Sequence, residues 1–137
     1  MNKLIVAESL FTNHKVVTCL DSVVDQQACI LGGHEDGSVR LYDLRSSHNG
    51  GVKQHKIFES NTSFISQVRI CPKDHNLFAA SGYDGKIRIW DLRNETEPLH
   101  TLKRKGEDFK VFALSWVGSN IVSGGSDSNV NIFTASV

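Results

Sequence analysis

The sequence predicts an all-β fold, a partial β-propeller of three consecutive four-stranded blades of which the last lacks its own fourth strand. Three stretches, GGHEDGSVRLYDLR, ASGYDGKIRIWDLR and SGGSDSNVNIFTAS, resemble one another and place Asp36, Asp84 and Asp127 in register. The aspartates are separated by 48 and 43 residues, which is the length of one propeller blade. Around them apolar and polar residues alternate with period two, as in strands and unlike helical repeats.

The single predicted domain, residues 1–137, divides into three units and a leading segment. Residues 15–59 and 63–103 form complete blades, and residues 110–137 form the incomplete one. The expected strands are Lys15–Leu20, Ala28–Gly33, Ser38–Asp43 and Lys53–Glu59, then Phe64–Ile70, Leu77–Ser81, Lys86–Asp91 and Glu97–Lys103, then Lys110–Trp116, Asn120–Gly125 and Asn129–Thr134. Within residues 1–10 the apolar run Lys3–Ala7 predicts the fourth strand of a preceding blade.

The third strand of each unit is apolar on both faces. Alternation puts Val39 with Leu41, Ile87 with Ile89 and Val130 with Ile132 on one face, and Tyr42, Trp90 and Phe133 on the other. A strand that is buried on both sides indicates blades stacked against each other, because one blade cannot cover its own two faces.

Composition and charge exclude several classes of protein. The 137 residues are 39% hydrophobic and 22% charged, and 15 basic and 15 acidic residues cancel to a net charge of zero. The totals therefore indicate no nucleic-acid or anionic-membrane surface. No apolar run reaches the roughly 20 residues of a spanning helix, and Met1–Leu10 lacks the apolar centre of a secretion signal, so we expect an intracellular protein.

Residues with reactive side chains form no recognisable catalytic or metal site. Cys19, Cys29 and Cys71 match no zinc spacing, and we expect buried thiols. His14 near Asp21, His34 beside Glu35 and His75 after Asp74 have no spacing that nucleophilic, metal or acid-base catalysis requires. We therefore expect no enzyme, no metal and no cofactor.

These motifs resemble the WD-repeat propeller family. Trp90-Asp91 is the signature pair, Tyr42-Asp43 a near match and Phe133-Thr134 a degenerate one. In that family a His before the first strand, a Ser or Thr on the second strand, the turn Asp and the third-strand Trp form a hydrogen-bonded chain. Here the turn aspartates and Ser123 are present, but Asn61 takes the place of the His, and Gly32 and Ala80 take the place of the Ser or Thr. The resemblance implies blades that depend more on packing than on this network.

A closer similarity extends over nearly the whole chain. The order of HKVVTCLDS, SVRLYDLRSS, GYDGKIRIWDLRNETEPLHTL and SGGSDSNVNIF resembles the last three repeats of the WD-repeat subunits of the PeBoW ribosome-assembly complex. This implies a non-catalytic scaffold in large-subunit biogenesis and pre-rRNA processing, in the nucleolus, with the block-of-proliferation subunit and pescadillo as partners. The alternative is a WD-repeat adaptor of another intracellular complex, in the cytoplasm. The family's amino-terminal ubiquitin-like domain and four further repeats are absent from this sequence, so contact with the midasin ATPase is not expected.

Partner contacts are expected from loop residues at the blade ends, because aromatic and arginine side chains dominate interface energetics. The candidates are His34 and Tyr83, in the turns between second and third strands, and Phe64, Arg104 and Phe109, near the loops that lead into first strands. For Phe64 and Phe109, packing between blades is an equal alternative. A rival hypothesis is peripheral ribosomal RNA contact through Lys103-Arg104-Lys105, although acidic Glu107 and Asp108 follow directly.

The strand count predicts exposed apolar faces. Four blades make about the smallest closed propeller, so three units leave one open face on the first and one beside Val130 and Ile132 on the third. The chain is therefore a fragment of a longer protein or a reduced version that pairs with something else. We expect the isolated chain to self-associate.

Overall fold

The computed structural model describes residues 3–5, 15–23, 29–43, 53–59, 64–103 and 109–134, and within these residues it contains strands and no helix. The first sheet comprises β1 (Val17–Ser22), β2 (Cys29–His34), β3 (Ser38–Asp43) and β4 (Lys53–Glu59). The second comprises β5 (Ile65–Ile70), β6 (Leu77–Gly82), β7 (Lys86–Asp91) and β8 (His100–Lys103), and the third β9 (Val111–Val117), β10 (Asn120–Gly125) and β11 (Val130–Phe133). The predicted all-β class and the partial propeller of three blades are confirmed.

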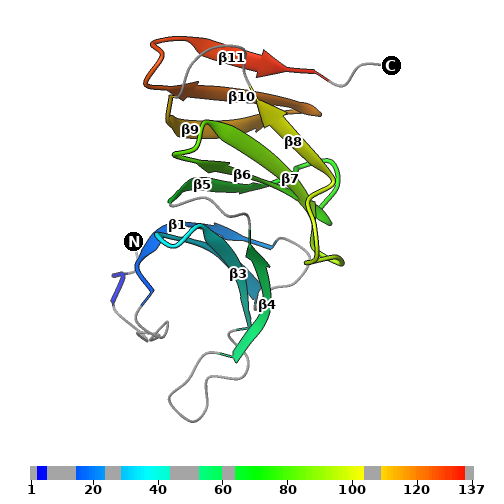
Figure 1. The fold of residues 1–137 in the computed structure, drawn as a ribbon. Coiled ribbons are helices and arrows are strands. Elements are labelled where there is room, and N and C mark those ends of the chain that lie inside the picture. Colours follow the sequence, from blue (N-terminus) through cyan, green and yellow to red (C-terminus); the bar gives the residue numbers. More distant parts are fainter. Residues whose placement is uncertain are drawn as a thin grey trace.

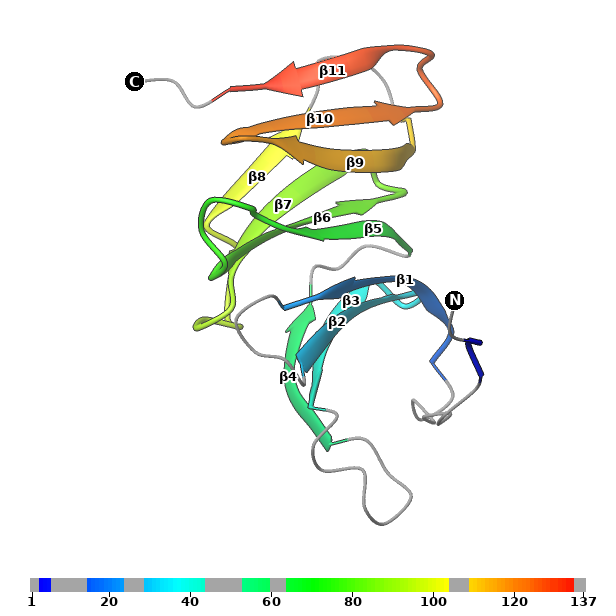
Figure 2. The same cartoon turned by 180° about the vertical axis from the view of Figure 1, so that it is seen from behind.

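Each sheet is an antiparallel meander whose strands follow chain order. The three sheets follow one another as blades, from β1–β4 at one end to β9–β11 at the other (Figure 1). The first strands β1, β5 and β9 lie next to each other along one side of the stack, as the view from behind shows (Figure 2). Because sequential blades are spatial neighbours, the second blade buries both of its apolar faces, and the first and third blades each bury one.

Most strand ends lie within two residues of their predicted positions, and the start of β8 differs most. β8 begins at His100, three residues after the expected start at Glu97. Pro98 has no backbone N–H to donate to a ladder, and the Leu99 N–H instead donates to the Ile89 carbonyl (2.7 Å). The intervening residues form the turn after β7, closed by a bridge between Asp91 and Asn94.

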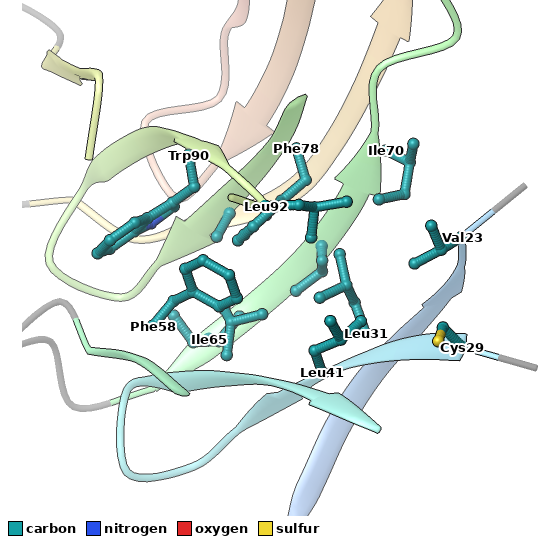
Figure 3. Close-up of a cluster of buried hydrophobic side chains, with 13 residues drawn as sticks. Val23, Cys29, Leu31, Leu41, Phe58, Ile65, Ile70, Phe78, Trp90 and Leu92 are labelled. Carbon is teal, nitrogen blue, oxygen red and sulfur yellow. The ribbon is translucent and has the colours of Figure 1, made fainter. Parts of the chain in front are cut away.

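The interface between the first and second blades is the larger of the two cores formed by the described residues. Leu31, Val39, Leu41 and Phe58 of the first blade pack with Ile65, Val68, Phe78, Trp90 and Leu92 of the second (Figure 3). Phe58 meets Phe78 and Trp90 edge to face, with ring centroids 4.9 and 5.3 Å apart. Such aromatic pairs add about 0.5–1.5 kcal/mol each to the free energy of area burial.

The interface between the second and third blades repeats this arrangement with different side chains. Ala79, Ile87 and Ile89 pack against Val111, Leu114 and Ile121, while Leu102, Trp116 and Phe133 are only partly buried at its margin. The predicted division of faces on the third strand holds, since Val39 and Ile87 face the following blade and Trp90 faces the preceding one.

Hydroxyl groups at β-bulges also join the blades. The first strand of every blade has a register shift near its start, and the unpaired residues are Thr18, Ser66 and Phe112. The Thr18 hydroxyl bonds to the Ile65 carbonyl of the second blade, and the Ser66 hydroxyl donates to the Val111 carbonyl of the third (2.6 Å). Phe112, at the same place in the third blade, has no hydroxyl, and its side chain is 48% exposed.

The outer faces of the first and third blades are open. Val130 and Ile132 are 75% and 67% exposed, whereas the residues at the same register positions in the second blade, Ile87 and Ile89, are buried. At the other end of the stack Leu20 is 55% exposed, while its counterpart Val68 is fully buried. An additional blade would cover either face in the way that the two internal interfaces already do.

The leading segment shows no strand in its described part. Residues 3–5 carry no strand structure, and the Leu4 and Ile5 side chains are exposed. The rest of the predicted strand Lys3–Ala7 lies outside the described residues, so the placement of residues 1–10 as a fourth strand of a preceding blade stays a prediction.

The open apolar faces predict self-association of the 137-residue chain. Sedimentation velocity should show dimers or larger species at micromolar concentration. Replacing Ile132 by Lys should weaken that association about ten-fold or more, because an apolar contact would have to bury an ammonium group.

The matched control is Thr101→Lys, which adds the same charge on the exposed strand β8 and should leave association unchanged. A monodisperse monomer for the unmodified chain would contradict the conclusion that these exposed apolar faces associate with another surface.

Candidate protein-interaction site

The turns between second and third strands are held by the three aspartates in register. Asp36, Asp84 and Asp127 each accept a hydrogen bond at Oδ1 from the backbone N–H two residues later, at 3.0, 3.1 and 3.2 Å. Asp36 and Asp84 also pair through Oδ2 with Arg40 and Arg88 on the following strand, at 3.3 and 2.8 Å. The aspartates thus fix the conformation of these turns.

A second aspartate, the last residue of the third strand, closes the turn that follows that strand. In the second blade Asp91 accepts hydrogen bonds from the Nε and backbone N–H of Arg93 and pairs with its Nη2 at 2.7 Å. The Arg93 side chain and backbone hydrogen bonds lower the pKa of Asp91 to about 2. The corresponding Asp43 is buried in the first blade.

In the first blade a Tyr–His pair takes the place of the hydrogen bond that the family forms between the third-strand Trp and the second-strand Ser or Thr. The Tyr42 hydroxyl lies 2.8 Å from Nε2 of His34, and both side chains are buried. Gly32 lies between them on the same face, and a Cβ there would be 3.1 Å from the Tyr42 ring. The Tyr42 hydroxyl therefore bonds to His34, two residues after position 32, where the family has its Ser or Thr.

The second blade has the tryptophan of the family's Trp–Ser hydrogen bond without the serine, and the third blade has the serine without the tryptophan. Trp90 in the second blade is fully buried, and its Nε1 has no hydrogen-bond partner, because the facing position on β6 is Ala80. In the third blade the corresponding position holds buried Ser123, but Phe133 replaces the tryptophan. A buried N–H without a partner costs about 1–3 kcal/mol.

Three aromatic side chains and a lysine gather at the edge of the second and third blades. Phe64 stacks on Tyr83, with ring centroids 4.4 Å apart and planes 19° apart. Phe112 meets Tyr83 edge to face at 5.6 Å, and Nζ of Lys110 lies 4.9 Å from the centre of the Tyr83 ring. We call these four residues the aromatic patch.

The fold positions this patch through equivalent places in the repeat. Phe64 and Lys110 precede the first strands of their blades, and each accepts, through its carbonyl, the N–H of the residue that begins a turn, Tyr83 (3.1 Å) or Ser126 (2.9 Å). Gly85 follows in the Tyr83 turn with φ of 78°, and a Cβ there would lie 2.6 Å from the Phe109 carbonyl oxygen. Close contact between the second and third blades therefore requires glycine in this turn.

Comparison with known proteins agrees with this geometry. The model of the WD domain, G-beta repeat family matches residues 6–43 and 51–91, which together are more than half of the chain. This chain belongs to the WD-repeat family.

Several curated WD-repeat relatives resemble this chain. Ribosome biogenesis protein YTM1 of Meyerozyma guilliermondii is 31% identical over 104 residues, 76% of this chain. The ribosome biogenesis protein WDR12 homologs of Aedes aegypti and Chlamydomonas reinhardtii are 31% and 27% identical over 79% and 93% of this chain. The chain covers only 22%, 25% and 30% of the lengths of these three relatives.

The WD-repeat blade places the predicted partner-binding residues in different environments. Tyr83 lies in the turn as expected, and Phe64 stacks on it. Phe109 is partly buried and packs on the core between the second and third blades, which is the alternative considered for it. Arg104 lies outside the described residues. The partner-contact role of Phe64, Tyr83, Arg104 and Phe109 stays a prediction.

The predicted position of His34 is corrected by the structure. His34 ends β2 rather than standing in the turn, and its side chain is fully buried and bonded to Tyr42. Burial, followed by the Arg40 charge, lowers the pKa of His34, while Asp36 opposes this shift. In this structure His34 offers no surface to a partner.

Sequence reasoning missed Phe112 and Lys110 as surface residues. Alternation along the first strand gives no sign of the bulge at Phe112 that leaves it unpaired. For Lys110 the available signal was its place directly before the first strand, which corresponds to that of Phe64.

Other kinds of site receive no support from the described residues. Of the predicted basic run only Lys103 belongs to them. Cys29 and Cys71 are buried, as expected, whereas Cys19 is only partly buried, and burial raises the pKa of its thiol. In the part of the chain that is described, no cluster of three or more His, Cys, Asp or Glu could hold a metal ion. The same residues include no helix that could span a membrane.

The unpaired Trp90 N–H predicts that Ala80→Ser stabilises the chain. A hydroxyl on the face of β6 that meets Trp90 would accept the indole N–H and raise the free energy of unfolding by about 1 kcal/mol, measured by urea denaturation. Ala79→Ser, on the opposite face of the same strand, is the control and should lower stability by about 1–3 kcal/mol. Equal effects of the two variants would contradict the assignment.

The buried His34 predicts a loss of stability in mild acid. Its pKa is lowered on folding, so the unfolded chain takes up a proton near its ordinary value of 6.5 before the folded chain does. The free energy of unfolding should therefore fall as pH decreases below about 6.5. In His34→Gln, which can still bond to Tyr42, this part of the decrease should vanish. An unchanged pH profile in that variant would be the contrary result.

Proposed function

We propose that this chain is part of a non-catalytic WD-repeat scaffold that binds proteins during ribosome biogenesis. The observation that carries the proposal is the similarity to relatives named ribosome biogenesis proteins over three quarters or more of the chain. Within that assignment, the aromatic patch is the surface that we assign to a protein partner.

The composition and exposure of the patch support a protein ligand. Aromatic side chains on a rigid scaffold provide contact area at low entropic cost and dominate interface hot spots. Phe112 is 48% exposed although it contacts Tyr83, so much of its ring is free for a ligand. Lys110 lies over the Tyr83 ring and adds a positive charge that favours an acidic group on the partner.

Catalysis is not part of the proposal. His34, the candidate base beside Glu35, is enclosed with Tyr42 inside the first blade and cannot reach a substrate in this structure. His14 lies outside the described residues.

The finer assignment rests on the resemblance of the repeat sequences. It places the chain in the nucleolus, in large-subunit precursors, with the block-of-proliferation subunit and pescadillo as partners and without a cofactor. The names of the relatives support the ribosome-assembly context.

A co-purification experiment tests the proposal. The tagged chain should recover large-subunit assembly proteins, identified by mass spectrometry, and the recovery should survive nuclease treatment. Tyr83→Ala and Phe112→Ala should each reduce it about ten-fold or more, as expected for a hot-spot residue. Leu99→Ala is the matched control, because Leu99 is also 48% exposed but lies outside the patch.

Loss of the association after nuclease treatment would favour the ribosomal RNA hypothesis. Recovery of a different set of intracellular proteins would favour an adaptor of another complex. Equal recovery with Phe112→Ala and Leu99→Ala would show that the aromatic patch is not the contact surface.

A further inference from the structure

An apolar groove opens between the second and third blades. It has a volume of about 320 Å³ and lies where the strands β9 and β11 end and the turn between β5 and β6 begins. Its walls are Leu77, Ile89, Leu102, Trp116, Ile121 and Phe133. The aromatic patch lies at the opposite ends of these strands, so the groove is a separate site.

The groove lies where three large side chains of the first interface are replaced by smaller ones in the second. Strand register aligns Leu102 with Phe58, since they pair with Ile87 and Val39 on the third strands. It likewise aligns the cross-strand pair Ile121 and Phe133 with the pair Phe78 and Trp90. Leu102, Ile121 and Phe133 are each smaller than their counterparts in the three-ring cluster of the first interface (Figure 3).

Trp116 is an exception to this decrease in size. Trp116 takes the place of the smaller Ile70, but its indole N–H donates to the Arg69 carbonyl (3.0 Å). This bond fixes the ring as one wall of the groove. The fixed position of its ring also makes Trp116 a spectroscopic reporter of a ligand that binds in the groove.

The first interface shows what fills such a space. Leu92, the residue after β7, is 6% exposed and packs in the cluster with Phe58 and Trp90. Its backbone is held at both ends, because its N–H donates to the Asn76 carbonyl (2.7 Å) and its carbonyl accepts from Nζ of Lys56 (2.9 Å). A leucine side chain with two backbone hydrogen bonds therefore closes the first interface.

The second interface has residues in the places of Asn76 and Lys56, but the residue that corresponds to Leu92 is not a leucine. Strand register aligns Ser119 with Asn76 and His100 with Lys56, and both Ser119 and His100 line the groove. The sequence position that corresponds to Leu92 is Ala135, which lies outside the described residues. The groove thus combines an apolar slot with an acceptor and a donor at its rim.

We propose that this groove binds the leucine side chain of an extended segment of a partner protein. The Ser119 carbonyl would accept the leucine N–H, and the His100 imidazole would donate to the leucine carbonyl, as Asn76 and Lys56 do for Leu92. The proposal goes beyond the scaffold function, because it assigns a second docking site with its own ligand chemistry.

The test uses a minimal ligand that carries these three features, N-acetyl-leucine-N′-methylamide. The 137-residue chain with the Ile132→Lys change, on the face of β11 away from the groove, limits self-association. The probe is titrated while the two indole N–H resonances are followed by NMR. The Trp116 resonance should shift, and that of Trp90, enclosed in the first interface, should stay in place as the internal reference. N-acetyl-alanine-N′-methylamide should bind about ten-fold more weakly, because it lacks the apolar side chain.

Variants that restore the larger side chains of the first interface provide the second arm. Leu102→Phe and Ile121→Phe should each fill the groove and reduce leucine-probe binding about ten-fold or more. Leu99→Phe adds the same ring outside the groove and should bind normally. An unchanged Trp90 resonance shows that each variant is folded.

Three results would overturn the proposal. The first is equal response to the leucine and alanine probes, the second is unchanged binding by both filled variants, and the third is no response of Trp116 to any probe, which would mean that the chain itself occupies the groove.

Discussion

A four-stranded blade has two apolar faces and no interior of its own, and this constraint shapes the whole chain. Each face must be covered by a neighbouring blade, so the cores of this protein lie between sheets. Phe58, Phe78 and Trp90 form the strongest example, with rings from two blades in mutual contact. The same constraint explains why Val130 and Ile132, in the positions of buried Ile87 and Ile89, are exposed on the last blade.

Polar interactions add to the apolar packing between the blades. Thr18 and Ser66 tie the first strands of successive blades together, and the turn aspartates hold the loops. Inside the blades the family's hydrogen-bonded chain is incomplete, because Trp90 lacks a partner and Tyr42 uses His34 instead of a second-strand Ser. The two internal interfaces consequently differ in what they leave open: the first is closed by Leu92, and the second retains a groove.

Periodic features could be predicted from the sequence, and local departures from the period could not. Alternation and Asp-Gly turns locate the strands to within a few residues, because each side chain's face follows from its parity along a strand. The bulge at Phe112 breaks that parity, which is why this exposed ring was missed. His34 was placed in the turn because its bond to Tyr42 depends on the space left by Gly32, a relation between residues on two strands. The groove depends on side-chain size at aligned positions of two interfaces, which only the strand register reveals.

Native-state hydrogen exchange tests the central claim, that packing between blades rather than bonding within them stabilises the chain. The account predicts the slowest exchange for amides of β6 and β7, which belong to the only described blade with a neighbour on both faces, and fast exchange for β11, whose outer face is open. The Ile132→Lys variant should be used, so that self-association does not protect β11. Equal protection of β7 and β11 would contradict the account, because it would mean that each blade is stable without a neighbour.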